Sequence, residues 1–296
     1  MLHLGTLVNL LASAPFVSGE ELASRLGVTR TAIWKQVGIL RELGYQITAH
    51  PRRGYHLVAR PDKLYPWEVG RDLHTELIGK TIEYYEELPS TNRRAKELLG
   101  SATEGTLILA ETQQQGRGRL GRSWFSPPGT GIWLSLILYP SFPPAELAKL
   151  NLLAAVALSR AVLATLAFRP LVKWPNDLYY QGRKLSGILT EVGGELGRLE
   201  YVILGAGINV NQKKSDFPEE LRTKAGSLRM IKGRPVNRRL LLCSFLECFE
   251  EEYFYALGQG FDRCLAYCRE HTATLGRPVE LDNGQKVYRG QAVAIA

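Results

Sequence analysis

The segment from Gly116 to Trp124, Gly-Arg-Gly-Arg-Leu-Gly-Arg-Ser-Trp, places the strongest constraint on what this chain can fold into. Its three glycines leave the backbone free to wrap around an anion, and its three arginines offer forked donors to phosphate-type oxygens. The glycine spacing also fits the fingerprint of dinucleotide-binding folds, but that fingerprint requires a helix directly after the loop. Ser126-Pro127-Pro128-Gly129 prevents such a helix. We therefore predict a flexible cationic loop that closes over an acidic ligand, with a solvated basic turn as the alternative.

A second motif, Lys173-Trp174-Pro175-Asn176-Asp177, combines one carboxylate with a lysine and an amide around a turn. Lys184 follows between two short apolar runs. Mg²⁺ in nucleotide sites takes one or two carboxylates plus the phosphates of the substrate. Asp177 is therefore a candidate metal ligand, directly or through water, while the lysines face phosphate oxygens. This motif favours a metal-nucleotide site.

Two further segments place small polar side chains next to apolar ones. Ser90, Thr91 and Asn92 precede a helical run, and taken alone they are most simply interpreted as an ordinary helix N-cap. The apolar strand pattern from Gly205 to Val210 carries Asn209. Neither segment identifies a function by itself.

In their order and spacing, these motifs closely resemble those of the biotin protein ligase family, and the resemblance covers nearly the whole chain. Members of that family activate biotin with ATP to biotinyl-5′-AMP. They then transfer the biotinyl group to one lysine of a biotin carboxyl carrier protein, such as the carrier domain of acetyl-CoA carboxylase. The resemblance implies an ATP-dependent, AMP-forming ligase that binds biotin, ATP and Mg²⁺.

The resemblance also implies a role for each motif residue. The residues implied to bind biotin are Ser90, Thr91, Asn92, Gln113, Arg117, Gly118, Arg119 and Lys184. The residues implied to bind ATP are Arg122, Trp124, Lys173, Asn176, Asp177 and Asn209, with Asp177 as the metal ligand. The predicted catalytic residues are Lys184, which bridges the carboxylate and the α-phosphate, and Arg119 in the closing loop.

Residues 1–62 have the pattern of a winged helix-turn-helix domain. Helix-start signals at Ser18 and Thr29 follow an apolar helical run, and two short strands, Tyr45 to Thr48 and Tyr55 to Val58, form a wing. The third helix turns an apolar stripe inward: Ala32, Ile33, Val37 and Leu40. The more exposed positions are candidate DNA contacts: Arg30, Thr31, Trp34, Lys35 and Arg41 in the helix, and Arg52 and Arg53 in the wing.

The charge distribution supports a polyanionic partner for this domain. Residues 1–60 hold seven Lys and Arg against three Glu, a net +4, in a chain of net charge +8. A helical protein-interaction module has similar patterning and is the alternative. The domain resembles the N-terminal winged helix of bifunctional biotin ligases, which implies operator binding and biotin-responsive repression of biotin-synthesis genes.

Residues 66–270 alternate strand and helix patterns and predict an α/β catalytic domain. The expected strands are Thr81 to Glu86, Thr106 to Glu111, Gly131 to Leu138, Leu171 to Lys173, Leu178 to Tyr180, Gly187 to Val192 and Tyr201 to Val210. The expected helices are Trp67 to Glu76, Asn92 to Leu99, Ala145 to Phe168 and Asn237 to Gly258. The resemblance implies a mixed sheet like that of class II aminoacyl-tRNA synthetases.

The pattern of residues 271–296 predicts two strands joined at the hairpin signal Asp282-Asn283-Gly284. The resemblance implies a small C-terminal barrel related to the SH3 fold. Because the chain stops at Ala296, before the further strands of that barrel, we expect an incomplete barrel with an unpaired edge.

Other features exclude competing classes of site. Cys243, Cys248, Cys264 and Cys268 lie in helical patterns without zinc-knuckle spacing, so we expect reduced thiols. The sequence contains no Walker-type phosphate loop. The apolar run Ala145 to Phe168 is interrupted by polar residues and predicts a core helix, not a membrane span. The N-terminus lacks the basic start of a signal peptide, so we expect a cytoplasmic protein with no membrane partner.

Two rival functions remain open at this stage. A pure transcriptional regulator would bind biotin as an effector without catalysis, but Asp177 and Lys184 argue against it. A lipoate ligase or octanoyltransferase would share the fold, but that group lacks the glycine-arginine loop in this form. A monomer would bind DNA weakly, so we expect a ligand-promoted homodimer. The resemblance implies that loops beside the dimer surface order when ligand binds, and the candidate loops are Gly116 to Ser126 and Gly193 to Arg198.

Overall fold

The computed structural model describes residues 2–194, 200–282 and 286–295, which divide into two compact units, 1–63 and 64–296. The hairpin signal at residues 282–284 and the turn at 193–198 fall partly outside the described residues. The C-terminal strands belong to the second unit. A separate domain beginning at residue 271 stays a prediction.

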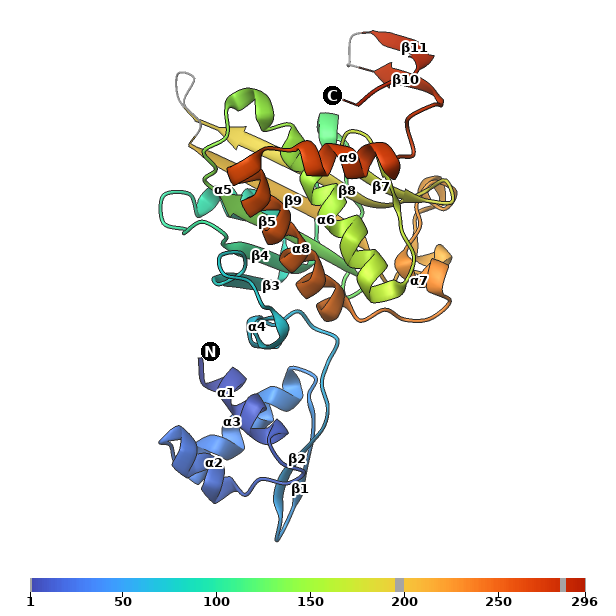
Figure 1. The fold of residues 1–296 in the computed structure, drawn as a ribbon. Helices are drawn as coiled ribbons and strands as arrows, with labels where there is room; N and C mark the ends of the chain where they lie inside the picture. The colour runs from blue at the N-terminus through green and yellow to red at the C-terminus, as the bar shows by residue number, and fades with distance from the viewer. Residues whose placement is uncertain (1, 195–199, 283–285, 296) are drawn as a thin grey trace. The chain divides into compact units, whose positions relative to one another are not determined.

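The first unit contains three helices and a two-stranded antiparallel sheet (Figure 1): α1 (Leu2–Ala12), α2 (Gly19–Leu26), α3 (Arg30–Glu42), β1 (Gln46–His50) and β2 (Gly54–Ala59). Ser18 and Thr29 cap α2 and α3 as predicted, each accepting a backbone N–H through its side-chain oxygen. Ile33, Val37 and Leu40 are buried, whereas Ala32 is only half-buried.

The wing is fastened to the segment between α1 and α2. Val17 and Tyr55 exchange two backbone hydrogen bonds, at 2.8 and 2.9 Å. Gly54 has a φ of +93°, and a Cβ at this position would overlap the Val17 carbonyl. Glycine is therefore required where β2 begins.

The second unit is built on a seven-stranded mixed sheet in the order β3-β4-β5-β9-β8-β7-β6. Strands β3 and β4 are parallel, and every other neighbouring pair is antiparallel. The strands are β3 (Ile82–Leu88), β4 (Leu107–Gln113), β5 (Gly131–Leu138), β6 (Leu171–Lys173), β7 (Asp177–Tyr180), β8 (Arg183–Gly193) and β9 (Tyr201–Asn209). The mixed sheet expected from the sequence is confirmed, and Lys184 lies on strand β8, which begins earlier than predicted.

Six α-helices and four short 3-10 turns accompany the sheet among the described residues. The helices are α4 (Pro66–Asp72), α5 (Thr91–Glu97), α6 (Lys149–Leu166), α8 (Arg238–Gln259) and α9 (Asp262–Glu270), with α7 (Leu228–Lys232) as one additional short turn of α-helix. The 3-10 turns are Arg119–Gly121, Pro144–Glu146, Lys214–Asp216 and Glu219–Leu221. The C-terminal strands β10 (Pro278–Asp282) and β11 (Val287–Gln291) form an antiparallel pair.

The prediction that the first helix of this unit extends to Glu76 is wrong, because α4 ends at Asp72. Two carboxylates of α8 hold the following segment in another conformation. Glu247 accepts the His74 N–H, and Glu250 accepts the N–H groups of residues 76–78 at 2.6 to 2.8 Å. Backbone donors used in this way cannot bond within a helix.

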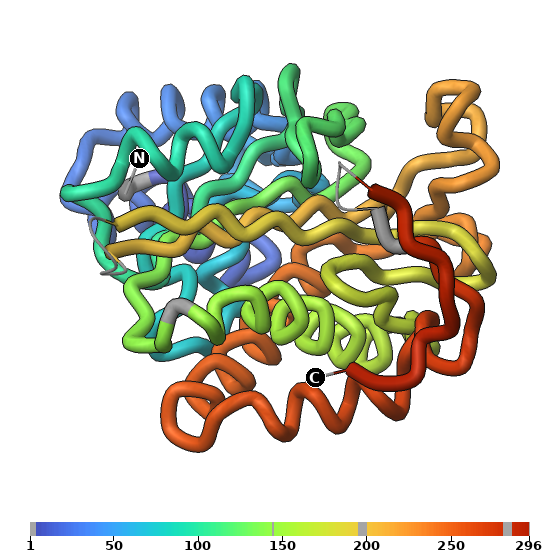
Figure 2. The backbone as a smooth tube through the Cα atoms, turned by 90° about the horizontal axis from the view of Figure 1, so that it is seen from above, coloured from blue at the N-terminus to red at the C-terminus, as the bar shows by residue number. Residues whose placement is uncertain are grey.

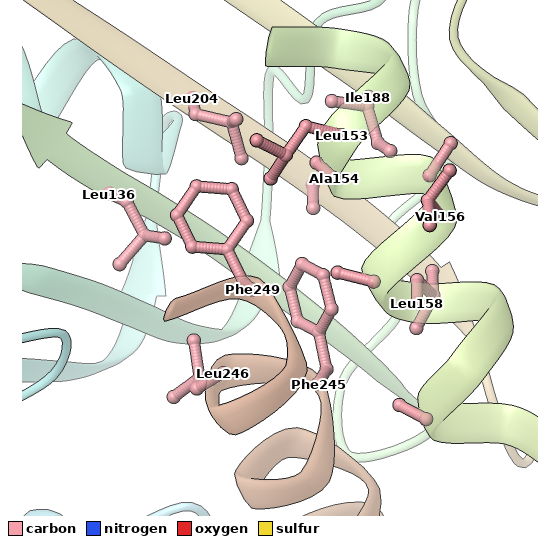
Figure 3. Close-up of a cluster of buried hydrophobic side chains, with 14 of the residues drawn as sticks. Leu136, Leu153, Ala154, Val156, Leu158, Ile188, Leu204, Phe245, Leu246 and Phe249 are labelled. Atoms are coloured by element: carbon pink, nitrogen blue, oxygen red, sulfur yellow. The ribbon is translucent and has the colours of Figure 1, made fainter. Parts of the chain in front are cut away.

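Helices α6, α8 and α9 cover one face of the sheet, and α5 lies on the other (Figures 1 and 2). Side chains alternate along the strands accordingly. On β5, Leu134, Leu136 and Leu138 belong to the large core under α6 and α8, whereas Ile137 belongs to the small core under α5. Figure 3 shows Phe249 of α8 directed at the sheet, close to Leu136 and Leu204.

Helix α6 is the one described helix whose length and apolar composition would suit a membrane span. In the structure 61% of that helix is buried within the unit. Its apolar character is therefore accounted for by packing in the core.

A fully buried ion pair joins four parts of the second unit. Arg238 of α8 donates to Glu111 Oε2 of β4 and to the Gly131 carbonyl of β5, both at 2.9 Å, and Glu111 Oε1 accepts the Leu64 N–H at 3.1 Å. Arg238 and Glu111 are 0% and 1% exposed. The two charges compensate each other, and these hydrogen bonds satisfy further donors and acceptors of the pair, as buried charges require.

Replacing Arg238 with Met should lower the free energy of unfolding by about 3 to 5 kcal/mol, because the Glu111 carboxylate would remain buried without its partner. Urea titration followed by circular dichroism measures this loss. The matched control is Arg93→Gln, which removes an exposed helical ion pair to Glu97 and should cost no more than about 0.5 kcal/mol. Equal effects of the two substitutions would contradict the structural role of the buried pair.

Candidate active site

The second unit contains a cavity of about 760 Å³. Every residue that the sequence assigned to biotin, ATP or metal lines it. These residues are Ser90, Thr91, Asn92, Gln113, Arg117, Gly118, Arg119, Arg122, Trp124, Lys173, Asn176, Asp177, Lys184 and Asn209. The structure therefore brings segments far apart in the sequence into one site.

Three glycines of β8 and β9 form an open floor for this cavity. A Cβ at Gly205 would overlap the Asn92 side chain, and one at Gly207 would overlap the Trp124 indole. A Cβ at Gly187 would come within 2.9 Å of the same indole. The absence of side chains at these positions lets Asn92 and Trp124 lie directly on the sheet.

The glycine-arginine loop folds back on itself in a narrow antiparallel arrangement. Trp124 N donates to Gly116 O at 2.8 Å, and Gly118 N donates to Arg122 O at 2.7 Å. The tip is a single 3-10 turn in which Leu120 has a left-handed φ of 55° and is 65% exposed. No α-helix follows, in agreement with the argument against a dinucleotide-binding loop. Arg119 donates to Asn176 Oδ1 at 3.1 Å and so connects the loop to the Trp-Pro-Asn-Asp turn.

The polar end of the cavity is a buried hydrogen-bond network. Gln113 Oε1 accepts from the backbone N–H and the hydroxyl of Thr91, at 2.8 and 3.1 Å. Ser135 of β5 contacts Thr91 Oγ1 at 2.8 Å and Asn92 Oδ1 at 2.6 Å. Ser90 occupies the N-cap position of α5, as the N-cap interpretation predicts, but its side chain makes no capping hydrogen bond.

The opposite end of the cavity is cationic. Lys184 Nζ lies 2.7 Å from Asp177 Oδ1 and 5.3 Å from the centre of the Trp124 ring. Asn176 is fixed by a hydrogen bond from its Nδ2 to the Ile188 carbonyl at 2.6 Å. Burial, followed by the charge of Asp177, raises the pKa of Tyr179 above its usual value of 10, so its hydroxyl stays protonated near neutral pH. This end can accept phosphate oxygens.

Asp177 is the only carboxylate among the predicted ligand residues, and the described residues contain no cluster of three or more His, Cys, Asp or Glu that could hold a metal. A site with one protein carboxylate fits a metal that takes its remaining ligands from phosphates and water. The four cysteines are free thiols. Burial raises the pKa of Cys243 to about 11, which keeps it protonated and unreactive.

Several cavity or network residues were not identified from the sequence. Glu191 of β8 accepts from Asn92 and Lys96, and Ser135 is the sole hydroxyl in the buried strand β5. Ser135 is a polar residue in a strongly apolar strand, a signal that indicates a buried polar network. Glu191 lies among other polar residues of β8, and its local sequence does not mark it. Phe217, Leu221 and Lys224 also line the cavity from the segment after β9, and nothing in their local sequence marks them.

The candidate DNA contacts all lie in the first unit. Arg30, Thr31, Lys35 and Arg52 are exposed, and Trp34 is 64% exposed. Arg41 is partly engaged within the domain, because its Nε donates to the Ile47 carbonyl at 2.9 Å. The Arg53 guanidinium stacks 3.7 Å from the centre of the Phe16 ring. These two arginines are therefore less free to reach DNA than the sequence pattern indicates.

Comparison with known proteins agrees with the fold and the site. Residues 84–209 match the biotin/lipoate A/B protein ligase family, and residues 4–56 match a helix-turn-helix domain. The fold and the cavity thus define the biotin and lipoate ligase class.

Individual relatives place the chain more narrowly. The bifunctional ligase/repressor BirA of Bacillus spizizenii is 39% identical over 285 residues, which cover 96% of this chain and 88% of that protein. BirA of Escherichia coli is 33% identical over 292 residues, with 96% and 87% covered. The biotin protein ligase of Aquifex aeolicus, solved with biotin and ATP, gives a TM-score of 0.65 at 32% identity, covering 73% of this chain and 88% of that one. The chain belongs to the bifunctional biotin ligase/repressor family.

The glycine floor yields a direct test of the site. Gly207→Ala should displace the Trp124 indole and weaken ATP binding at least about tenfold, since overpacking of this kind typically costs 1 to 3 kcal/mol. Isothermal titration calorimetry with ATP measures the effect. Gly70→Ala adds a Cβ in open space on α4 and should leave ATP binding as it is in the native protein. Undiminished ATP affinity in the Gly207 variant would remove Trp124 from the nucleotide site.

Proposed function

We propose that this protein activates biotin with ATP to biotinyl-5′-AMP, transfers biotin to a lysine of a biotin carboxyl carrier protein, and represses biotin genes in response to that adenylate. One observation carries the ligase proposal. A single cavity contains a neutral polar network at one end and a cationic region, which includes the glycine-arginine loop, at the other. Such a cavity suits a ligand with a polar ring at one end and a carboxylate that must meet a phosphate at the other.

The chemistry requires alignment and charge neutralisation, with no covalent enzyme intermediate. A carboxylate oxygen of biotin attacks the α-phosphorus of ATP, the new P–O bond forms in line, and pyrophosphate leaves. Lys184 is our proposed catalytic cation, since its ammonium lies at the cationic end of the cavity and its charge would offset the two approaching anions. Arg122, Trp124, Lys173, Asn176 and Asn209 would hold the nucleotide.

Mg²⁺ would shield the phosphate charges during this attack, and Asp177 is the residue that would hold it. Asp177 now forms an ion pair with Lys184. With Asp177 engaged in holding the metal, the Lys184 ammonium would be available to the α-phosphate. The arrangement therefore suits a lysine that is held in place before the nucleotide arrives.

The closing loop serves retention of the adenylate. Arg117, Gly118 and Arg119 lie on a hairpin whose backbone bonds are already formed, so closure would move it as a unit. Ser90, Thr91, Asn92 and Gln113 would hold the biotin ring. In the second half-reaction the acceptor lysine attacks the mixed anhydride, an amide forms and AMP leaves.

For regulation, we propose a cytoplasmic, adenylate-promoted homodimer that binds two operator half-sites. The exposed surface of α3 with Arg30, Thr31, Trp34 and Lys35 would enter the major groove, and Arg52 of the wing would contact the backbone. Arg41 and Arg53 would also contact DNA, through the guanidinium N–H groups that their contacts within the domain do not use. We also propose that the mixed sheet is related to that of class II aminoacyl-tRNA synthetases. The C-terminal strands would belong to a barrel related to the SH3 fold.

The catalytic proposal is tested with Lys184→Ala, which should lower adenylate formation on the order of 10²- to 10³-fold, because charge between two anions is left uncompensated. Pyrophosphate release with biotin and Mg-ATP measures it, and carrier labelling with biotin or lipoate identifies the substrate. Lys80→Ala, an exposed lysine outside the cavity, is the control. Near-native pyrophosphate release by the Lys184 variant would remove this residue from its role, and labelling by lipoate alone would replace the proposed substrate.

The regulatory proposal predicts that biotin with Mg-ATP raises operator affinity roughly 5- to 150-fold, the usual range of coupling between two sites. Gel-shift titration on the upstream region of a biotin-synthesis gene measures the affinity, and sedimentation measures the accompanying dimer. A scrambled duplex of equal length is the control. Equal affinity with and without ligand would leave a ligase whose DNA binding biotin does not control.

A further inference from the structure

A carboxylate lies directly behind the polar end of the cavity. Glu191 Oε2 accepts from Asn92 Nδ2 and Oε1 accepts from Lys96 Nζ, both at 2.7 Å. The Glu191 side chain is 25% exposed, and it is not among the residues that line the cavity. Glu191 therefore reaches a ligand only through Asn92, which is buried and does line the cavity.

Glu191 fixes the orientation of the Asn92 amide. Burial favours a higher pKa for Glu191, but hydrogen bonds from Lys96 and Asn92 outweigh it and hold the pKa below its usual value of 4.5. An ionised carboxylate only accepts hydrogen bonds. The Asn92 NH₂ group must then face Glu191, and its oxygen must face Ser135.

The orientation of the Asn92 amide determines which hydrogen bonds Ser135 and Thr91 donate and accept. The Ser135 hydroxyl has one hydrogen but two oxygen neighbours, Asn92 Oδ1 at 2.6 Å and Thr91 Oγ1 at 2.8 Å. With Asn92 Oδ1 facing it, Ser135 donates to Asn92. Thr91 can then donate to Ser135 or to Gln113 Oε1, and its own lone pairs stay open toward the cavity.

We propose that Glu191 is a positioning residue that sets the donor and acceptor directions of this network and so leaves Thr91 as an acceptor for a ring N–H of biotin. The inference rests on the proposed function, because it takes biotin as the ligand. The ureido ring of biotin carries two N–H donors beside its carbonyl oxygen. A pocket that presented only donors to it would leave these groups unpaired.

Glu191→Gln tests the proposal with almost no change in shape. The introduced amide keeps its oxygen on Lys96 and turns its NH₂ toward Asn92, so Asn92 must reverse. Ser135 then donates to Thr91 and occupies the lone pair meant for biotin. We expect biotin binding without ATP to weaken about tenfold, the equivalent of one hydrogen bond, and the loss in turnover to fall on KM for biotin and not on kcat.

Two control variants distinguish the proposed role of Glu191 in orienting hydrogen bonds from a purely structural role. Lys96→Met removes the ion pair but leaves the Glu191 charge, so Asn92 keeps its orientation and biotin affinity should stay within about twofold. Glu97→Gln removes a charge from the exposed side of the same helix and should behave likewise. Thermal unfolding of the full chain confirms that each variant is folded.

The outcomes are distinct. Calorimetry in which only Glu191→Gln loses affinity supports the proposal. Native affinity in Glu191→Gln overturns it, as does an equal loss in Lys96→Met, which would assign the effect to the ion pair. A native protein that binds no biotin overturns the proposed function itself, and the inference with it.

Discussion

The buried ion pair between Arg238 and Glu111 is the constraint on which the site depends. Glu111 lies on β4 shortly before Gln113, the residue that organises the polar end of the cavity and from which the glycine-arginine loop departs. By joining α8, β4 and the start of β5, the pair fixes where that loop begins. Water cannot compensate either charge at this depth, so the pair restricts these elements to one arrangement.

On this framework the cavity separates two kinds of chemistry. Neutral hydrogen-bonding groups from α5, β4 and β5 gather at one end, and lysine, arginine and aspartate from the loop and from β7 and β8 gather at the other. The glycines of β8 and β9 make this possible, because side chains at Gly205 and Gly207 would occupy the space of Asn92 and Trp124. The sheet thus supplies room as well as support, because Gly205 and Gly207 present no side chain to the cavity.

Local patterns were sufficient for part of this architecture. The strands, the caps at Ser18 and Thr29 and the motif residues follow from periodicity, turn chemistry and motif order. Other features depend on pairing between distant segments. Helix α4 ends at Asp72 because Glu247 and Glu250 of α8 take the next backbone donors. Glu191 meets Asn92 because helix α5 packs on β5 and β9, and β8 is the next strand of the sheet. No rule about neighbouring residues contains such information, although a lone polar residue in an apolar strand indicates that a partner must exist.

The control of DNA binding that we propose for the adenylate requires that the ligand change a surface outside the cavity. The glycine-arginine loop meets this requirement, since Arg117 and Arg119 line the cavity while Leu120 at its tip is exposed. Its backbone bonds are formed without ligand, so the ligand has only to fix the position of the loop and need not fold it. Fixing a preformed hairpin costs less conformational entropy than ordering a free segment. More of the binding energy of the adenylate would then be available to favour the proposed dimer, and linkage requires that such a dimer in turn hold the adenylate more tightly.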